Sequence, residues 1–425
     1  MTTFLYQLRY LVLFLIGCTL PLSASAQYTD LQDVRPHSQY GVNVFEPPQA
    51  DTVEYDGFEV DWGAAFTQQF QALSQSNSAQ APDLPELGPG FNLATANLYL
   101  GAQLAEGITV NLTTYLSSRH HPEAWVKGGY LQVDELPITD NPALSSLMDY
   151  VTLRVGHFEV NYGDAHFRRT DNGNALYNPF VGNYILDSFT TEIGGEVYLR
   201  SPGGLLGMVG ITGGEINGGV TSPDDRAPSF YGKVGFDRQI NEDLRLRLTG
   251  SAYTTTASQN NTLHSGDRAG SRYYSVMGEG DWSGRIRSGF SDAVTSFMVN
   301  PFIEFKGLEL FGTIEQVSGS RAGLSDGSLD QYAVEGVYRF ANEDLFVGAR
   351  YNTMSGDLDI SGFGEEPNWV DVGVDRWQIS GGWFVTPNVL AKVEYMAQSY
   401  DDYPSATVFH EGEFSGLMIE GIVMF

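Results

Sequence analysis

Residues 377–400, WQISGGWFVTPNVLAKVEYMAQSY, decide the fold class of this chain. From Trp377 onward, apolar residues and glycine alternate with more polar residues, until residues 387–388, Pro-Asn, end the run. A second alternating run follows, in which Lys392 and Glu394 share the polar face. Successive side chains of a strand point to opposite faces, so two such runs joined by a tight turn predict an antiparallel β-hairpin.

Alternating runs of this kind recur along the chain, separated by turn residues. The sixteen predicted strands are residues 57–70, 91–104, 108–117, 124–134, 150–160, 190–200, 205–213, 229–240, 244–256, 294–305, 308–318, 331–340, 345–355, 374–385, 389–400 and 413–425. A soluble β-sandwich also alternates. Charges at successive positions of the polar faces, and aromatic residues near the strand ends, favour a membrane barrel instead.

The connections between these strands alternate between short and long. Short turns are expected at residues 106–107, 202–204, 241–243, 306–307, 342–344 and 387–388, and longer polar connections at 257–293, 319–330, 356–373 and 401–412. The longer connection 135–149 is the exception on the short-turn rim. Short periplasmic turns, long external loops and an even strand count are typical of bacterial outer-membrane proteins. We therefore predict an all-β fold, a transmembrane antiparallel β-barrel of about 16 strands over residues 57–425.

Composition agrees with this class and excludes several others. Only 18% of residues are charged, below the roughly 25% of soluble domains, and 13% are aromatic. The net charge of −29 argues against nucleic acid as a partner, because phosphate binding needs a basic face. The single cysteine excludes disulfide frameworks and cysteine-based metal sites, and we expect no cofactor.

The first 26 residues have the pattern of a signal peptide. Arg9 is their only charge, the following run is apolar, and Ala24-Ser25-Ala26 is a small-residue cleavage site. A competing lipoprotein cleavage box ends at Cys18, so lipidation of this residue stays open. Residues 27–56 are polar and lack a strand pattern, which leaves a periplasmic tether or a segment folded into the lumen. We expect an exported protein in the bacterial outer membrane, surrounded by lipid.

The last predicted strand ends on Phe425, after an alternating amphipathic run. A terminal phenylalanine in this position resembles the signal that the barrel-assembly machinery reads. We therefore predict that machinery as a partner and Phe425 as the assembly signal.

A barrel of this strand number has a lumen wide enough for an aqueous channel. The alternation also places charges of both signs on the inner faces of the strands. The predicted pore-lining residues are Arg154, Arg200, Arg245, Arg247, Glu304, Glu315, Glu335, Arg339, Arg350, Arg376, Lys392 and Glu394, and Lys127, Glu196, Lys233, Asp237 and Glu309 face the same way. Charges at bilayer depth are costly unless they face water or one another, so the lumen is either wet or braced by ion pairs.

The third external connection, residues 161–189, is the candidate for narrowing this lumen. It carries two adjacent arginines, Arg168 and Arg169, among glycine, asparagine and aromatic residues. Rings of arginine or lysine favour anions, so the predicted constriction consists of Arg168, Arg169, His166, Asp164 and Asp171. In the alternative interpretation the loop is exposed and its arginines pair with Asp164, Asp171 or Asp187.

A family resemblance follows from the segment KGGYLQV at residues 127–133 and the segment LRVGHFEVNYG at 153–163, which enters loop 161–189. The chain resembles the phosphate-selective porin O and P family and related trimeric 16-stranded porins. The family has glutamine where His157 stands and Pro-Phe-Gly where residues 161–163 stand. Its selectivity depends on a lysine-rich pore, whereas this chain has four lysines, so the resemblance implies a porin but not phosphate selectivity.

The resemblance also implies a homotrimer. The short connection at residues 118–123 agrees with this, because it predicts a lower barrel wall on that side. Catalytic motifs are absent, and we predict no enzyme and no metal site. His166 beside Asp164 is the best acid–base pair, and a barrel hydrolase ranks third among the functions.

The first function is a porin for passive diffusion of small hydrophilic solutes or ions. The alternative is a non-conducting structural or adhesion barrel that binds partners through its long loops. For ion selectivity, the acidic loops argue for cations, whereas Arg168 and Arg169, with Arg245 and Arg247 behind them, argue for weak anion preference.

Overall fold

The computed structural model describes residues 35–46, 55, 57–80, 84–117, 124–137, 141–216, 218–265, 274–278, 283–321, 326–359 and 369–425. All of them belong to one compact unit, Leu31–Phe425. The predicted signal peptide, Cys18 and the connection 118–123 lie outside the described residues.

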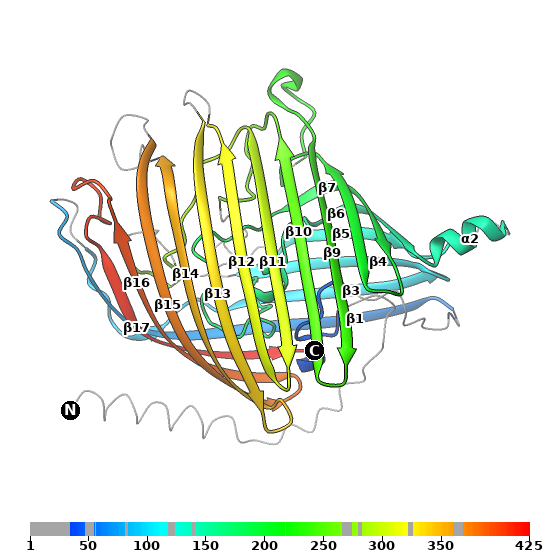
Figure 1. The fold of residues 1–425 in the computed structure, drawn as a ribbon, viewed down its shortest axis with the longest axis horizontal. Coiled ribbons are helices and arrows are strands. Elements are labelled where there is room, and N and C mark those ends of the chain that lie inside the picture. Colours follow the sequence, from blue (N-terminus) through cyan, green and yellow to red (C-terminus); the bar gives the residue numbers. More distant parts are fainter. Residues whose placement is uncertain are drawn as a thin grey trace. The chain divides into compact units, whose positions relative to one another are not determined.

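The described chain forms one antiparallel sheet that closes on itself (Figure 1). Its strands are β1 (Glu59–Ser76), β2 (Gly90–Phe91), β3 (Thr95–Ala105), β4 (Ile108–Ser117), β5 (Ala124–Val133), β6 (Val151–Glu159), β7 (Thr191–Arg200), β8 (Leu205–Thr212), β9 (Ser229–Asn241), β10 (Leu244–Thr255), β11 (Val294–Phe305), β12 (Leu308–Gly319), β13 (Gly327–Phe340), β14 (Leu345–Asp359), β15 (Trp369–Thr386), β16 (Val389–Asp401) and β17 (Glu413–Met424). Consecutive strands pair with one another, and β1 pairs with both β3 and β17, which closes the barrel.

The predicted fold class is confirmed. Each of the sixteen predicted strands corresponds to one long strand, and the two-residue β2 is the addition among the described residues. The largest differences in start are at β3, which begins later than predicted, and at β13 and β15, which begin earlier because residues of the expected loops continue the ladder.

The short turns follow from local backbone chemistry. Between β11 and β12, Lys306 and Gly307 both have positive φ, 51° and 80°, as a two-residue hairpin turn that matches strand twist requires. A Cβ on Gly307 would lie 2.5 Å from the carbonyl oxygen of Arg339, so glycine is needed at this position.

Helices are few in the described residues. The helix α2 (Pro142–Met148) lies in the long connection on the short-turn rim and projects from the barrel at the right of Figure 1. Asn141 caps it by accepting a hydrogen bond from the backbone N–H of Ala143, 3.0 Å away. In the part of the chain that the structure describes, no helix combines the length and apolarity needed to cross a membrane.

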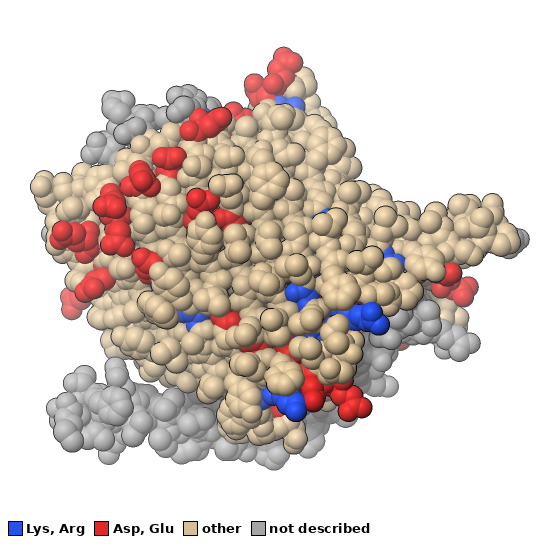
Figure 2. All heavy atoms as spheres, viewed as in Figure 1, with Lys and Arg blue, Asp and Glu red and all other residues tan. Residues whose placement is uncertain are grey.

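The two faces of the wall differ as the alternation predicts. On the outer face, Trp377 and Ile379 are 60% and 63% exposed, as lipid-facing side chains should be. Between them Gln378 points inward and is fully buried. Figure 2 shows acidic side chains along the upper edge of the barrel in this view and few charges over the middle of the wall.

Candidate functional site

Loop 161–189 folds against the inward-facing side chains of the wall, and nearly all of its residues are buried. Its first anchor is Asp164, just before a single 3-10 turn, η3 (Ala165–Arg168). Arg247 Nε and Thr249 Oγ1 of β10 donate to Asp164 Oδ2 at 2.8 and 2.7 Å, and Lys233 Nζ of β9 donates to Oδ1 at 2.9 Å. Burial raises the pKa of Asp164, but Arg247 and Lys233 outweigh burial and hold this pKa below its ordinary value.

The two adjacent arginines of the loop are buried and ion-paired. Arg168 Nε donates to Glu335 Oε1 of β13 at 2.7 Å, and its Nη2 donates to Glu309 Oε2 of β12 at 3.1 Å. Arg169 makes a bidentate contact within the loop, donating to both carboxylate oxygens of Asp187 at 2.7 Å. Both arginines are therefore paired with carboxylates, Arg168 with those of the wall and Arg169 with one of the loop itself. Their role at a constriction stays a prediction.

The second half of the loop follows the wall from β16 to β12. Lys392 Nζ donates to the carbonyl oxygens of Ala175, Asn178 and Phe180, and Glu394 accepts from the backbone N–H of Val181. The next anchors, each on the neighbouring strand, are Arg376 to Asn183, Asn352 to Ile185, Gln331 to Leu186 and Glu315 to Ser188. Inward-facing polar side chains thus satisfy backbone groups, and the Ser188 hydroxyl, in the buried second half of the loop.

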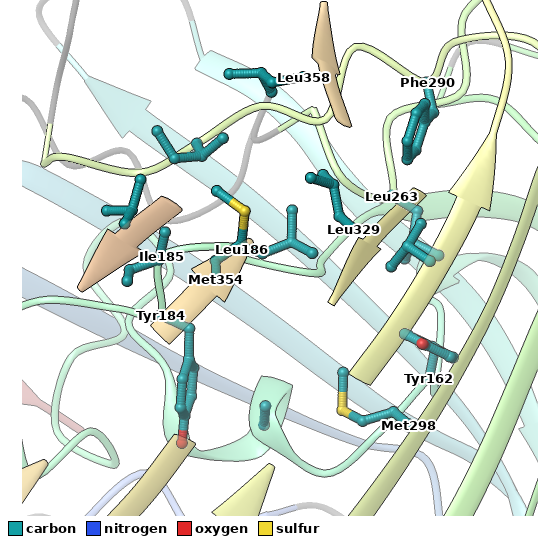
Figure 3. Close-up of a cluster of buried hydrophobic side chains, with 14 of the residues drawn as sticks. Tyr162, Tyr184, Ile185, Leu186, Leu263, Phe290, Met298, Leu329, Met354 and Leu358 are labelled. Atoms are coloured by element: carbon teal, nitrogen blue, oxygen red, sulfur yellow. The ribbon is translucent and has the colours of Figure 1, made fainter. Parts of the chain in front are cut away.

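A second internal segment comes from the connection between β10 and β11. Leu263 and Phe290 of this connection are 1% exposed and belong to the same apolar cluster as Ile185 and Leu186 of loop 161–189. Figure 3 shows these side chains together with Met354 and others from the strands. This part of the lumen is therefore packed by an apolar core.

A third internal segment is N-terminal to β1. We call residues 35–46 the N-terminal strap. At one end, the Gln39 backbone N–H donates to the carbonyl oxygen of Pro387, 2.7 Å away, in the turn between β15 and β16. At the other end, Arg247 Nη2 of β10 donates to Glu46 Oε2 at 2.7 Å. The strap therefore connects the β15–β16 turn with β10, which lies five strands before β15 in the sheet.

A cavity of about 270 Å³ remains between the strap, loop 161–189 and the wall of β3–β7. Its lining mixes aromatic and aliphatic side chains with polar and charged ones, which include Arg35, Glu46, Lys127, Arg154, Glu159 and Arg200. Arg154 Nη2 donates to Gln132 Oε1 at 3.0 Å, and its guanidinium lies 4.5 Å from the ring centre of Tyr130. Arg200 Nη1 donates to Thr152 Oγ1 at 3.0 Å.

The predicted site residues divide between this cavity and the packed part of the lumen. All twelve predicted pore-lining residues are on the inner faces of their strands, but of these only Arg154 and Arg200 border the cavity, together with His166 and Asp171 of the loop. The others include buried ion pairs: Arg339 with Glu309, Arg350 with Glu335, and Lys392 with Glu420. Glu304 and Arg245 face each other across β10 and β11.

Sequence reasoning missed the cavity residues of the strap, Arg35, His37 and Glu46. Their segment has no alternation of apolar and polar residues. Its apolar residues Val42 and Phe45 do not indicate which strands of the wall the segment contacts. Among the described residues, no group of three histidine, cysteine, aspartate or glutamate side chains is placed to hold a metal ion.

Comparison with solved structures identifies the fold. An anion-selective porin from Comamonas acidovorans aligns with a TM-score of 0.53 and 10% identity, over 87% of this chain and 100% of the porin. OprB from Pseudomonas putida aligns with a TM-score of 0.52 and 10% identity, over 87% and 94% of the two chains. The trimer form of OmpT, an outer membrane protein of Vibrio cholerae, aligns with a TM-score of 0.51 and 12% identity. The alignment covers 87% of this chain and 100% of the OmpT chain.

These likenesses, at such low identity, show the fold: the chain is a closed antiparallel barrel of the outer-membrane type. No protein-family model matches the chain, and no curated protein matches its sequence.

Proposed function

We propose that this protein is an outer-membrane porin through which small hydrophilic solutes or ions diffuse passively. The observation that carries the proposal is the polar cavity of about 270 Å³ inside a closed barrel, between loop 161–189 and β3–β7. The fold shared with an anion-selective porin supports it. The proposed path runs along this cavity, because the opposite part of the lumen holds the apolar core.

Single-channel recording in a planar bilayer tests this path. Asn111→Trp places a large side chain from β4 into the cavity, whereas Val110→Trp on the same strand is the control, since Val110 does not border the cavity. We expect ohmic steps from the wild type and the control, and steps several-fold smaller from Asn111→Trp. Equal conductance in all three would contradict the proposed path.

A second candidate is the non-conducting barrel that binds partners through its external loops. The specific observation in its favour is the extent of internal packing: the strap, loop 161–189 and the β10–β11 connection all contribute buried side chains. The same recording decides, because correctly folded wild-type protein without conductance steps would support this candidate.

For selectivity, the sequence resemblance to the phosphate-selective porin O and P family offers one finer hypothesis. Three of the four lysines face the lumen as ion pairs: Lys127 with Asp171, Lys233 with Asp164 and Lys392 with Glu420. A free lysine-based phosphate site therefore has no support among the described residues. Arg35, Arg154 and Arg200 along the cavity support the more general proposal of weak anion preference.

A further inference from the structure

The N-terminal strap ends in a cluster of alternating charges on the inner faces of β9 and β10. Lys233, Arg245 and Arg247 supply three positive charges there. Asp237 of β9 and Asp164 of loop 161–189 supply two negative charges, through Arg245 Nη2 to Asp237 Oδ2 at 2.7 Å and the contacts of Asp164 given above. Without the strap, these five ion-paired groups have one positive charge in excess, and Glu304 of β11 faces Arg245 beside them.

The strap supplies the third carboxylate. Glu46 accepts from Arg247 Nη2 at 2.7 Å and from Lys233 Nζ at 3.1 Å, and its side chain is 4% exposed. Burial raises the pKa of Glu46, but the charges of Arg247 and Lys233 hold it well below its ordinary value, so Glu46 is ionised at neutral pH.

Other strap residues fix this carboxylate in place. The Phe45 ring centre lies 4.2 Å from the Arg247 guanidinium and 5.4 Å from the ring centre of Phe302. The Asn43 side-chain amide donates to Glu309 Oε1 at 2.7 Å, and the Asn43 backbone carbonyl oxygen accepts from Arg245 Nη1 at 3.0 Å. Phe45 and Glu46 both border the cavity, so this neutralised cluster stands at its edge.

We propose that residues 35–46 are a fixed strap across the lumen and that the Glu46 carboxylate sets the ion selectivity of the channel. It does so because it borders the cavity and cancels positive charge of Lys233 and Arg247, which pair with it and are not themselves part of the cavity lining. The inference rests on the proposed porin function and assigns its selectivity to a segment outside the barrel strands. Loss of the carboxylate makes the cluster more positive by one charge, which favours anions over cations.

The first experiment measures the reversal potential of Glu46→Gln in a potassium chloride gradient. Glutamine keeps the size of the side chain and removes its charge. We expect the chloride-to-potassium permeability ratio to rise about two- to fivefold, the effect of one unit charge about 8 Å from a hydrated ion. Glu242→Gln is the matched control, because Glu242 is exposed in the β9–β10 turn, and it should leave the ratio unchanged.

The second experiment detects strap position without any current. Ser38 is 2% exposed within the strap, so a Ser38→Cys thiol should react slowly with a membrane-impermeant maleimide. Adding Phe45→Ala and Glu46→Gln should raise its labelling rate towards that of denatured protein. The wild type, whose single cysteine is Cys18, gives the background.

The outcomes separate the two proposals. If the wild type conducts and Glu46→Gln leaves its reversal potential unchanged, the selectivity role of Glu46 is wrong. Rapid labelling of the Ser38→Cys variant with the strap otherwise intact overturns the fixed strap itself. If no variant conducts, the porin function fails and the selectivity role fails with it, while slow labelling still supports the strap.

Discussion

Lys392 shows how one inward side chain organises many neighbours. Its ammonium donates to three loop carbonyls at 2.9–3.0 Å and pairs with Glu420 Oε1 at 2.7 Å, with both side chains fully buried. Four acceptors around one ammonium satisfy groups that have no access to water. Lys392 therefore stabilises the path of loop 161–189 as well as the contact between β16 and β17.

Lys392→Met should destabilise the barrel strongly. It removes the cation that pairs with the Glu420 carboxylate and the donor to three carbonyls. Breaking a buried pair from one side costs about 3–5 kcal/mol. The measurement is the temperature at which the folded, fast-migrating band converts to the unfolded one on electrophoresis.

Lys306→Met is the matched control for this prediction. Lys306 pairs with Asp243 at 3.3 Å, but the two side chains are 60% and 53% exposed. Exposed pairs contribute about 0–1 kcal/mol, so the transition temperature should hardly change. Equal shifts for both variants would mean that the buried contacts of Lys392 do not stabilise the barrel.

At the scale of the element, loop 161–189 is held by contacts that differ in kind along its length. Its beginning is fixed by ion pairs of Asp164 and Arg168 with the wall, whereas Ile185 and Leu186 pack into the apolar core. The charged beginning borders the cavity, and the apolar part does not. Substitutions in the charged part should therefore affect conduction more directly.

Replacement of Arg168 and Arg169 by alanine should enlarge the conductance and shift the reversal potential towards cation preference. The substitution removes two side chains near the cavity and takes one arginine partner from each of Glu335 and Asp187. Glu335 keeps its ion pair with Arg350. Reversal potential and single-channel conductance in a salt gradient measure both effects.

The matched control replaces two exposed arginines, Arg238 and Arg321, by alanine. This variant removes the same formal charge from the surface and should behave as the wild type. If the variant of Arg168 and Arg169 also behaves as the wild type, the loop does not line the constriction.

The strands were predictable because alternation is a local property. The assignment of Trp377 and Gln378 to opposite faces follows from their neighbours in sequence and needs no distant residue. The turn at Lys306-Gly307 is predicted from local sequence in the same way. The partners of Arg168 were not predictable. Glu309 and Glu335 are more than one hundred residues away, and which inward carboxylate the loop meets depends on the register of the whole barrel.

The strap was harder still to predict. Glu46 lies in a polar segment without periodicity, and its contact with Arg247 joins residues 201 positions apart. Its sequence therefore left open whether the segment is a periplasmic tether or lies in the lumen. The contacts of Glu46 with Lys233 and Arg247 exist only once the wall of the barrel has assembled.

At the scale of the whole molecule, the wall has a short side and a tall side. β6, β7 and β8 have 9, 10 and 8 residues, whereas β13, β14 and β15 have 14, 15 and 18. Outward side chains of the short side are apolar, with Val155 and Val209 62% and 64% exposed. The family resemblance of the sequence implies a homotrimer, and we propose this apolar short side as its contact face.

Native mass measurement in mild detergent should therefore give three chains. Val155→Arg with Val209→Arg on the short side should reduce the trimer to monomers, whereas arginine at outward Val347 of β14 should not. A wild-type protein that is monomeric in mild detergent would contradict the trimer.

The closure between β1 and β17 has a consequence for how the chain folds. Its register runs from Ala65 opposite Met424 to Ser76 opposite Glu413. The first long strand can therefore complete its pairing only after the last strand has been synthesised. Contacts of such sequence separation form slowly, and until they form both strands keep unpaired edges that invite aggregation. The strap precedes β1 and contacts β9 to β12 inside the ring, so its insertion must be coordinated with this late event. The time between synthesis of the first and last strands is therefore the period in which this barrel most needs protection.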